Sequence, residues 1–174
     1  DASVVPLLAK TAAQGTDDDK KLIVESLVRL RGADVDGAMI ELLAKAPPAE
    51  QRELIRGLVL RKAASAVPAL LVLAGNKDSE VRAEAVIAVG RLGNQSACDG
   101  LLKALTIDPD GAAAAMAEIC RREGTVAPML AVLKKAQGEG KAALLGALDA
   151  LGGAEALGAV RAEERQRPGD ERLE

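Results

Sequence analysis

The sequence predicts an all-α protein in which about five helical hairpins stack into a solenoid. Similar segments begin near residues 6, 37, 68 and 99, which are 31 residues apart, and a fifth begins near residue 128, after 29. A period of about 30 residues is typical of stacked units that each bury their apolar face against a neighbour. Helix-forming residues dominate the chain, and no segment alternates like a half-buried strand. The chain also lacks Phe, Tyr and Trp, which suits thin layers of closely packed helices.

The clearest hairpin spans residues 78–105. Asp78 is placed to cap its first helix, and Glu80 complements the positive end of the helix dipole. Apolar residues follow at three- and four-residue steps, which is the spacing of one helix face. Gly93 ends this helix, a short turn follows, and a second helix begins near Ser96. The segment therefore predicts two antiparallel helices.

The other units repeat this plan. We predict first helices at residues 18–31, 48–61, 79–92, 109–122 and 140–151, and second helices at 3–13, 35–45, 66–74, 97–106, 126–136 and 154–164. Pro6, Pro68 and Pro128 recur near the start of second helices, where a first-turn proline is tolerated. We expect residues 1–165 to form the solenoid, as a piece of a longer bacterial-type protein, and residues 166–174 to form a charged, flexible tail.

One unit resembles a known family. Residues 78–93 (DSEVRAEAVIAVGRLG), followed by Ala97 and by LLKAL at residues 101–105, resemble a HEAT repeat of the short type found in phycobilisome lyases. Residues 66–71 and 125–130 resemble the second half of the same repeat. The resemblance implies a right-handed α-α superhelix whose second helices line the concave face. It indicates architecture and leaves the binding partner open.

The residue inventory excludes several classes of function. The chain has no histidine, so it cannot form a Ser-His-Asp or Cys-His site, and the metal-dependent hydroxylases built on HEAT repeats need His-Glu pairs. We expect no catalytic residues, no cofactor and no metal, and therefore no enzyme. The net charge of −3 and the absence of aromatic residues make nucleic acid an unlikely partner. No apolar run is long enough to span a membrane, and we expect a cytoplasmic protein.

Charged residues separate between the two ends of the predicted first helices. Acidic residues gather around the helix starts, and basic residues gather in the last turns, which predicts a basic edge along the stack. Two interpretations stay open: these charges complement the helix dipoles, or the basic edge binds an acidic partner. The residues of the basic edge are Arg29, Arg31, Arg61, Lys62, Arg91, Arg121 and Arg122.

The second helices supply a second candidate surface. The position four residues after each Pro6-like residue is expected to face the concave side, with two further lysines beside it. This row has mixed charge, which a peptide or protein partner tolerates, and it also has the composition of an ordinary solvated face. Its members are Lys10, Glu41, Lys45, Val72, Lys103, Val132 and Lys134.

The two cysteines are expected near each other. Cys98 begins one predicted second helix and Cys120 ends the next first helix, so both lie at the same edge of the stack. Two readings are open: a pair of small buried residues, since free cysteine usually packs as a modest hydrophobe, or a redox pair.

The function predicted from these patterns is a non-enzymatic helical-repeat scaffold that binds another protein or a peptide. One alternative is a bilin lyase-like accessory protein that acts on a tetrapyrrole-bearing partner. Another is weak electrostatic binding of nucleic acid along the basic edge, which would weaken steeply with salt. An end-to-end homodimer through residues 3–13 is also plausible on sequence grounds, because uncapped ends of repeat stacks tend to associate.

Overall fold

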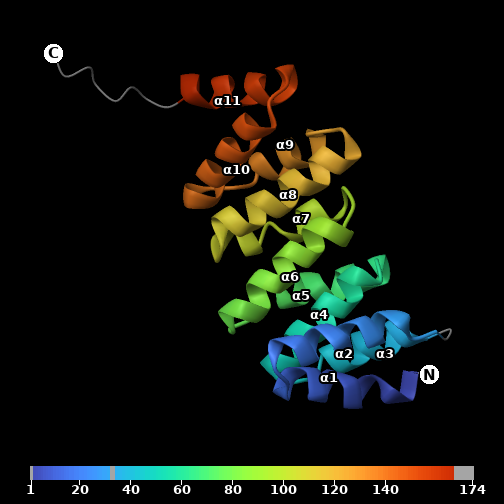
Figure 1. Cartoon of the computed structure of the whole chain (residues 1–174). Coiled ribbons are helices and arrows are strands. Elements are labelled where there is room, and N and C mark those ends of the chain that lie inside the picture. Colours follow the sequence, from blue (N-terminus) through green and yellow to red (C-terminus); the bar gives the residue numbers. More distant parts are fainter. Residues whose placement is uncertain (1, 32–33, 167–174) are drawn as a thin grey trace.

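The computed structural model describes residues 2–31 and 34–166. Within this part every regular element is helical, and the helices stack into an elongated solenoid (Figure 1). The all-α repeat architecture predicted from the 31-residue spacing is confirmed. None of the described helices is both long and apolar enough to cross a bilayer.

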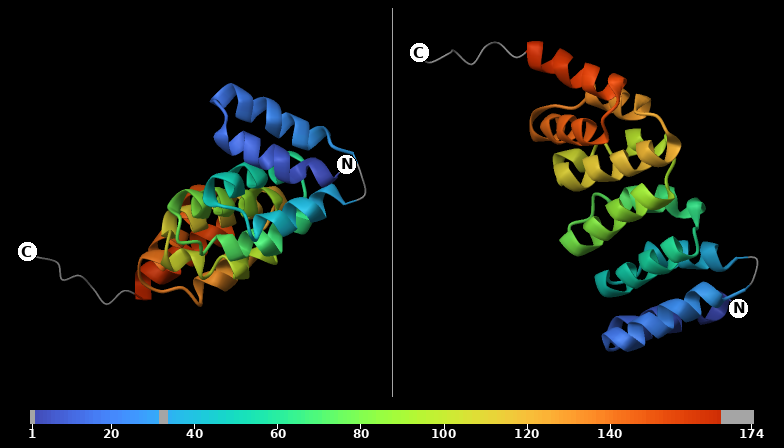
Figure 2. Two further views of the ribbon diagram at one scale, coloured as in Figure 1. Left: turned by 90° about the horizontal axis from the view of Figure 1, so that it is seen from below. Right: turned by 45° about the horizontal axis from the view of Figure 1, so that its top comes forward.

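The first helices of the repeats form one layer (Figures 1 and 2). They are α2 (Asp17–Arg29), α4 (Pro48–Leu60), α6 (Ser79–Leu92), α8 (Pro109–Glu123) and α10 (Gly138–Leu151), and each packs on the next. All ten predicted ends of these helices fall within two residues of the observed ones. The agreement reflects local signals, because proline at the start and glycine after the end mark several of these boundaries.

The second helices form the other layer and are mostly shorter. They are α1 (Val5–Gln14), α3 (Val35–Leu43), α5 (Val67–Leu73), α7 (Ala97–Gly100), α9 (Ala127–Leu133) and α11 (Ala154–Gln166), with short 3₁₀ turns η1 (Ala2–Val4) and η2 (Ala64–Ala66) before α1 and α5. Because α11 continues to Gln166, the predicted tail does not begin at residue 166. Residues 167–174 lie outside the described residues.

The predicted second helix at residues 97–106 is wrong as a continuous α-helix. After α7 the chain turns through residues 101–103 into a 3₁₀ turn, η3 (Ala104–Thr106). Here several backbone N–H groups donate to the carbonyl three residues earlier, as Leu102 does to Asp99 at 3.2 Å and Thr106 to Lys103 at 3.2 Å. Gly100 lies where the winding changes, and glycine is a poor residue for a helix interior.

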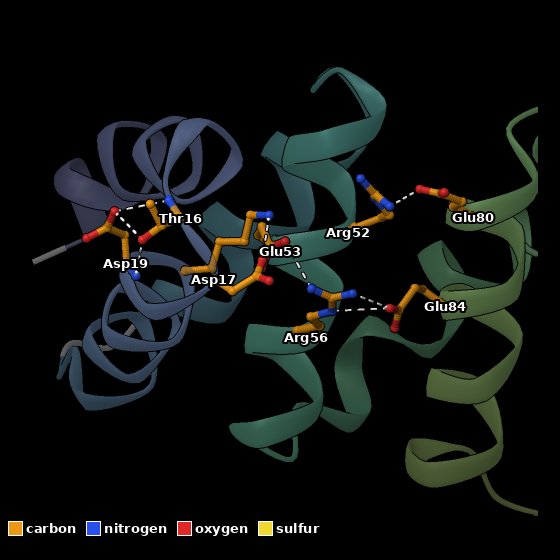
Figure 3. A network of polar contacts seen from close by, with 9 residues as sticks. Thr16, Asp17, Asp19, Arg52, Glu53, Arg56, Glu80 and Glu84 are labelled. Atoms are coloured by element: carbon orange, nitrogen blue, oxygen red, sulfur yellow. Dashed lines mark hydrogen bonds and ion pairs between the residues drawn. The ribbon is translucent and has the colours of Figure 1, made fainter.

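Polar side chains cap the N-termini of several first helices. Thr16 and Asp19 form a capping box at α2: the Thr16 N–H donates to Asp19 Oδ2 at 3.0 Å, and the Asp19 N–H donates to Thr16 Oγ1 at 3.3 Å (Figure 3). The hydrogen bonds from Thr16 lower the pKa of Asp19. Asp78 accepts two backbone hydrogen bonds at the start of α6, as predicted. These acidic residues therefore cap helices in the fold.

The core is one continuous cluster of aliphatic side chains from α1 to α11. Between α6 and α8 the helices approach so closely that a Cβ added to Gly90 would lie 3.0 Å from Ala115 Cα. Buried alanines dominate this contact. The missing aromatic residues are consistent with this packing, because large rings would hold the two backbones apart.

Candidate protein-binding surface

Arg61, which follows the last residue of α4, binds the carboxyl end of the preceding first helix, α2. Its Nη1 donates to the carbonyl oxygens of Leu27, Val28 and Leu30 at 3.1, 3.0 and 2.9 Å, and its Nε donates to Asp36. The last carbonyls of a helix have no intrahelical donors and carry partial negative charge, so a buried guanidinium stabilises them well. The Arg61 side chain is only 14% exposed.

Arg122 makes the same kind of contact two repeats later. Its guanidinium donates to the carbonyl oxygens of Gly90 at 2.9 Å, of Arg91 at 3.0 Å, and of Gly93, at the end of α6. Arg61 and Arg122 therefore each cap the first helix of the preceding repeat, about 31 residues earlier in the chain. The carbonyl groups that receive these hydrogen bonds belong to the preceding first helix, so both arginines link one repeat to the next.

The other residues of the predicted basic edge are exposed, and their contacts are weak or short in range. Arg29 lies 3.8 Å from Glu25, and Arg121 forms an ion pair with Glu118 at 2.7 Å, both within one helix. Arg31, Lys62 and Arg91 are exposed. Arg61 is the one partly buried member of the predicted basic edge, whereas Arg122 stays exposed while it donates to the carbonyls of α6, so six of the seven cations lie at the surface.

A network of ion pairs joins α4 to α6 (Figure 3). Arg56 donates to Glu84 Oε1 through Nε at 3.1 Å and through Nη2 at 2.7 Å, and Arg52 pairs with Glu80. The hydrogen bonds from Arg56 to Glu84 contribute most to raising the pKa of the guanidinium. Sequence reasoning missed these pairs, although each joins residues 28 positions apart, close to one repeat length.

Glu53 is the buried member of this network. Its side chain is 5% exposed, and its Oε1 accepts a hydrogen bond from Arg56 Nη1 at 3.1 Å. The second carboxylate oxygen, Oε2, is buried and has no hydrogen-bond partner among the described residues. An orphaned acceptor of this kind is costly, since it has given up its water without gaining a donor.

Two hollows lie on the layer of first helices. The first, with a volume of about 580 Å³, opens over α2, α4 and α6, and we call it the α2–α4–α6 groove. The second, of about 930 Å³, lies between α8 and α10 and is lined largely by alanine. The apolar residues of the α2–α4–α6 groove are Val24, Ile55, Val59, Leu60, Ile87 and Ala88.

The candidate surface predicted on the second helices lies on the opposite layer from these hollows. Six of its members are exposed, namely Lys10, Glu41, Lys45, Val72, Lys103 and Lys134, and none lines either hollow. Val132 is fully buried and is removed from the surface. The helix α9 is rotated about its axis so that Met129, Val132 and Leu133 are buried. In α5 the corresponding residue, Val72, is 77% exposed.

The two cysteines are both buried and free, and they are neighbours as predicted. The thiol of Cys98 hydrogen-bonds to Cys120, and this bond together with burial raises the pKa of Cys98. The same hydrogen bond, helped by one from the Met129 backbone, lowers the pKa of Cys120 to about 7. Cys120 is therefore the thiol that ionises first.

The comparison with protein families assigns the architecture. The family model for HEAT repeats matches residues 35–122, which make up half of the chain and run from the start of α3 to one residue before the end of α8. The chain belongs to the HEAT-repeat family. This match is to HEAT repeats in general and does not extend to the phycobilisome-lyase type. The comparison with curated proteins found no match.

The arginine contacts in this HEAT-repeat stack predict unequal effects of two similar substitutions. Arg61→Met keeps the aliphatic stem but removes the donors to three carbonyl oxygens, so we expect the free energy of unfolding to fall by about 2 kcal/mol. Arg29→Met, at an exposed site, should change it by less than about 0.5 kcal/mol. Urea unfolding followed by far-ultraviolet circular dichroism measures both. Equal effects would show that Arg61 does not stabilise the end of α2.

The cysteine pair predicts a pH-dependent stability. With a folded pKa of about 7 and an unfolded value of about 8.5, Cys120 binds fewer protons in the folded state between these values. Unfolding free energy should therefore rise with pH across this window. Thiolate absorbance should show one ionisation near pH 7, without interference because the chain has no tyrosine. Cys98→Ala should raise the pH midpoint of this ionisation, and an unchanged midpoint would contradict the hydrogen bond between the two thiols.

Proposed function

We propose that this chain is a non-enzymatic scaffold that binds another protein through its layer of first helices. The observation that carries the proposal is the α2–α4–α6 groove, whose lining combines aliphatic and charged side chains. Leu60 and Ile87 are 57% and 50% exposed at this groove. Exposed apolar side chains next to charged groups are common on protein-binding surfaces.

HEAT repeats generally serve as protein-interaction scaffolds, and this supports the proposal. Neither alternative from the sequence gains a supporting observation. Binding of nucleic acid along the basic edge is weakened because Arg61 and Arg122 donate to backbone carbonyls inside the stack. The bilin lyase alternative rested on a narrower resemblance than the family match covers. The chemistry available in the groove is recognition by apolar contact and ion pairing.

A pair of matched sites tests which layer binds the partner. A photo-crosslinking amino acid is placed at residue 87 in the groove or at residue 72 on the opposite layer, both of which carry exposed β-branched residues. In cells of the source organism we expect a discrete adduct from position 87, and none from position 72. Excess chain with native Ile87 should suppress the adduct, whereas the Ile87→Asp chain should not. Adducts from position 72 alone, or from neither position, would contradict the proposal.

A further inference from the structure

The α2–α4–α6 groove contains one polar group that the fold leaves unsatisfied. Glu53 lines the groove and is 4% exposed as a whole residue. One of its oxygens accepts from Arg56, and the other, Oε2, has no donor within the part of the chain that the structure describes. A buried carboxylate oxygen with no partner is a place where an incoming donor gains more than it would at the surface.

Two arginines of α4 near Glu53 are already engaged in ion pairs. Arg56 is shared between Glu53 and Glu84 (Figure 3), and Arg52 pairs with Glu80. Together these five residues carry two positive and three negative charges, so the network has a net charge of −1. The lining of the groove itself has four acidic and four basic residues, so its charges balance, and the feature that favours an incoming donor is the unsatisfied Oε2.

Lys20 also lines the groove but pairs elsewhere. Its Nζ lies 3.2 Å from Asp17 and forms no ion pair with Glu53. The Asp17 side chain is fully exposed, so this surface contact is cheap to break. Because Glu53 Oε2 is buried, an incoming donor would have to displace neighbouring side chains of the groove such as Lys20 to reach it.

The number of free acceptors points to the kind of cation. Glu53 has one oxygen to offer because Arg56 holds the other. An arginine fork recognises a carboxylate best when both oxygens are free, whereas the lysine ammonium is a compact donor that suits one acceptor. The described residues contain no group of three or more metal-ligating side chains. Val59 and Ile87 line the same groove, and they suit aliphatic groups next to the cation.

We propose that the α2–α4–α6 groove binds a protein segment in which a lysine is flanked by aliphatic residues. The lysine ammonium donates to Glu53 Oε2, and the aliphatic side chains pack on Val59 and Ile87. This inference rests on the proposed scaffold function and names the chemistry of the partner at that same groove.

Two short peptides test this inference on the intact chain. Acetyl-Leu-Lys-Leu-amide and acetyl-Leu-Gln-Leu-amide are titrated separately into methyl-labelled protein, and the methyl resonances of Val59 and Ile87 are followed by NMR, with Val72 as the remote reference. We expect the lysine peptide to shift the groove methyls and to bind about tenfold more tightly than the glutamine peptide, which is the effect of one charge-assisted hydrogen bond. Val72 should not shift.

Two variants of α4 complete the test. Glu53→Gln should abolish the preference for lysine, whereas Glu50→Gln, on the same helix outside the groove, should retain it; far-ultraviolet circular dichroism confirms that both variants are folded. Equal binding of the two peptides to the native chain, or a lysine preference that survives in Glu53→Gln, would overturn the inference. A discrete crosslink at residue 87 alongside equal peptide binding would overturn the lysine site alone. If there is neither a crosslink at residue 87 nor a preference for the lysine peptide, the scaffold function is overturned as well.

Discussion

The close approach of consecutive first helices is the constraint on which the rest of this structure depends. Each hairpin is thin and contains no aromatic side chain, so its apolar area is small and must be covered by a neighbour at short range. Gly90 against Ala115 shows how short that range is. Gly140 of α10 makes a similarly close contact with the other layer, since an added Cβ there would lie 3.2 Å from Leu105 Cβ in η3. Small residues at these contacts are therefore required by the stacking.

Arginine side chains also link neighbouring first helices, and the acceptor group alternates between backbone carbonyls and carboxylates from one contact to the next. Arg61 joins α4 to α2 through backbone carbonyls, Arg52 and Arg56 join α4 to α6 through carboxylates, and Arg122 joins α8 to α6 through carbonyls again. Between α8 and α10 the described residues show no such link, and the larger hollow lies there. Arg61 and Arg122, two of the seven residues of the predicted basic edge, thus act between repeats, and Glu53 keeps one oxygen that has no hydrogen-bond partner among the described residues.

The sequence predicted the features that depend on neighbouring residues in the chain. The ends of the first helices follow from Asp78, Pro48, Pro109 and Gly93, whose effects are local. The broken helix after Gly100 was missed because its winding changes over a single turn. The burial of Val132 was missed for another reason: the roll of α9 depends on what α7, α8 and α10 present to it, and the repeat spacing does not contain that information.

The binding surface was less predictable than the fold. The pairing of Glu53 with Arg56 at a spacing of three residues is visible in the sequence, but the second partner, Glu84, comes from the next repeat. Comparing residues about one period apart would have found both this pair and the contact of Arg61 with Leu30. The unsatisfied oxygen of Glu53 could not be inferred in this way, because it depends on the full set of side chains around α4.

Two glycine substitutions measure the central constraint most directly. Both Gly90 and Gly146 lie within first helices, but an added Cβ at Gly146 meets nothing within 4 Å. Gly146→Ala should therefore raise the free energy of unfolding by about 0.5–1 kcal/mol, as expected for glycine replaced in a helix. Gly90→Ala should lower it, because the backbone of Ala115 blocks the new methyl group. An equal gain from both substitutions in urea unfolding would show that the first helices do not depend on close approach.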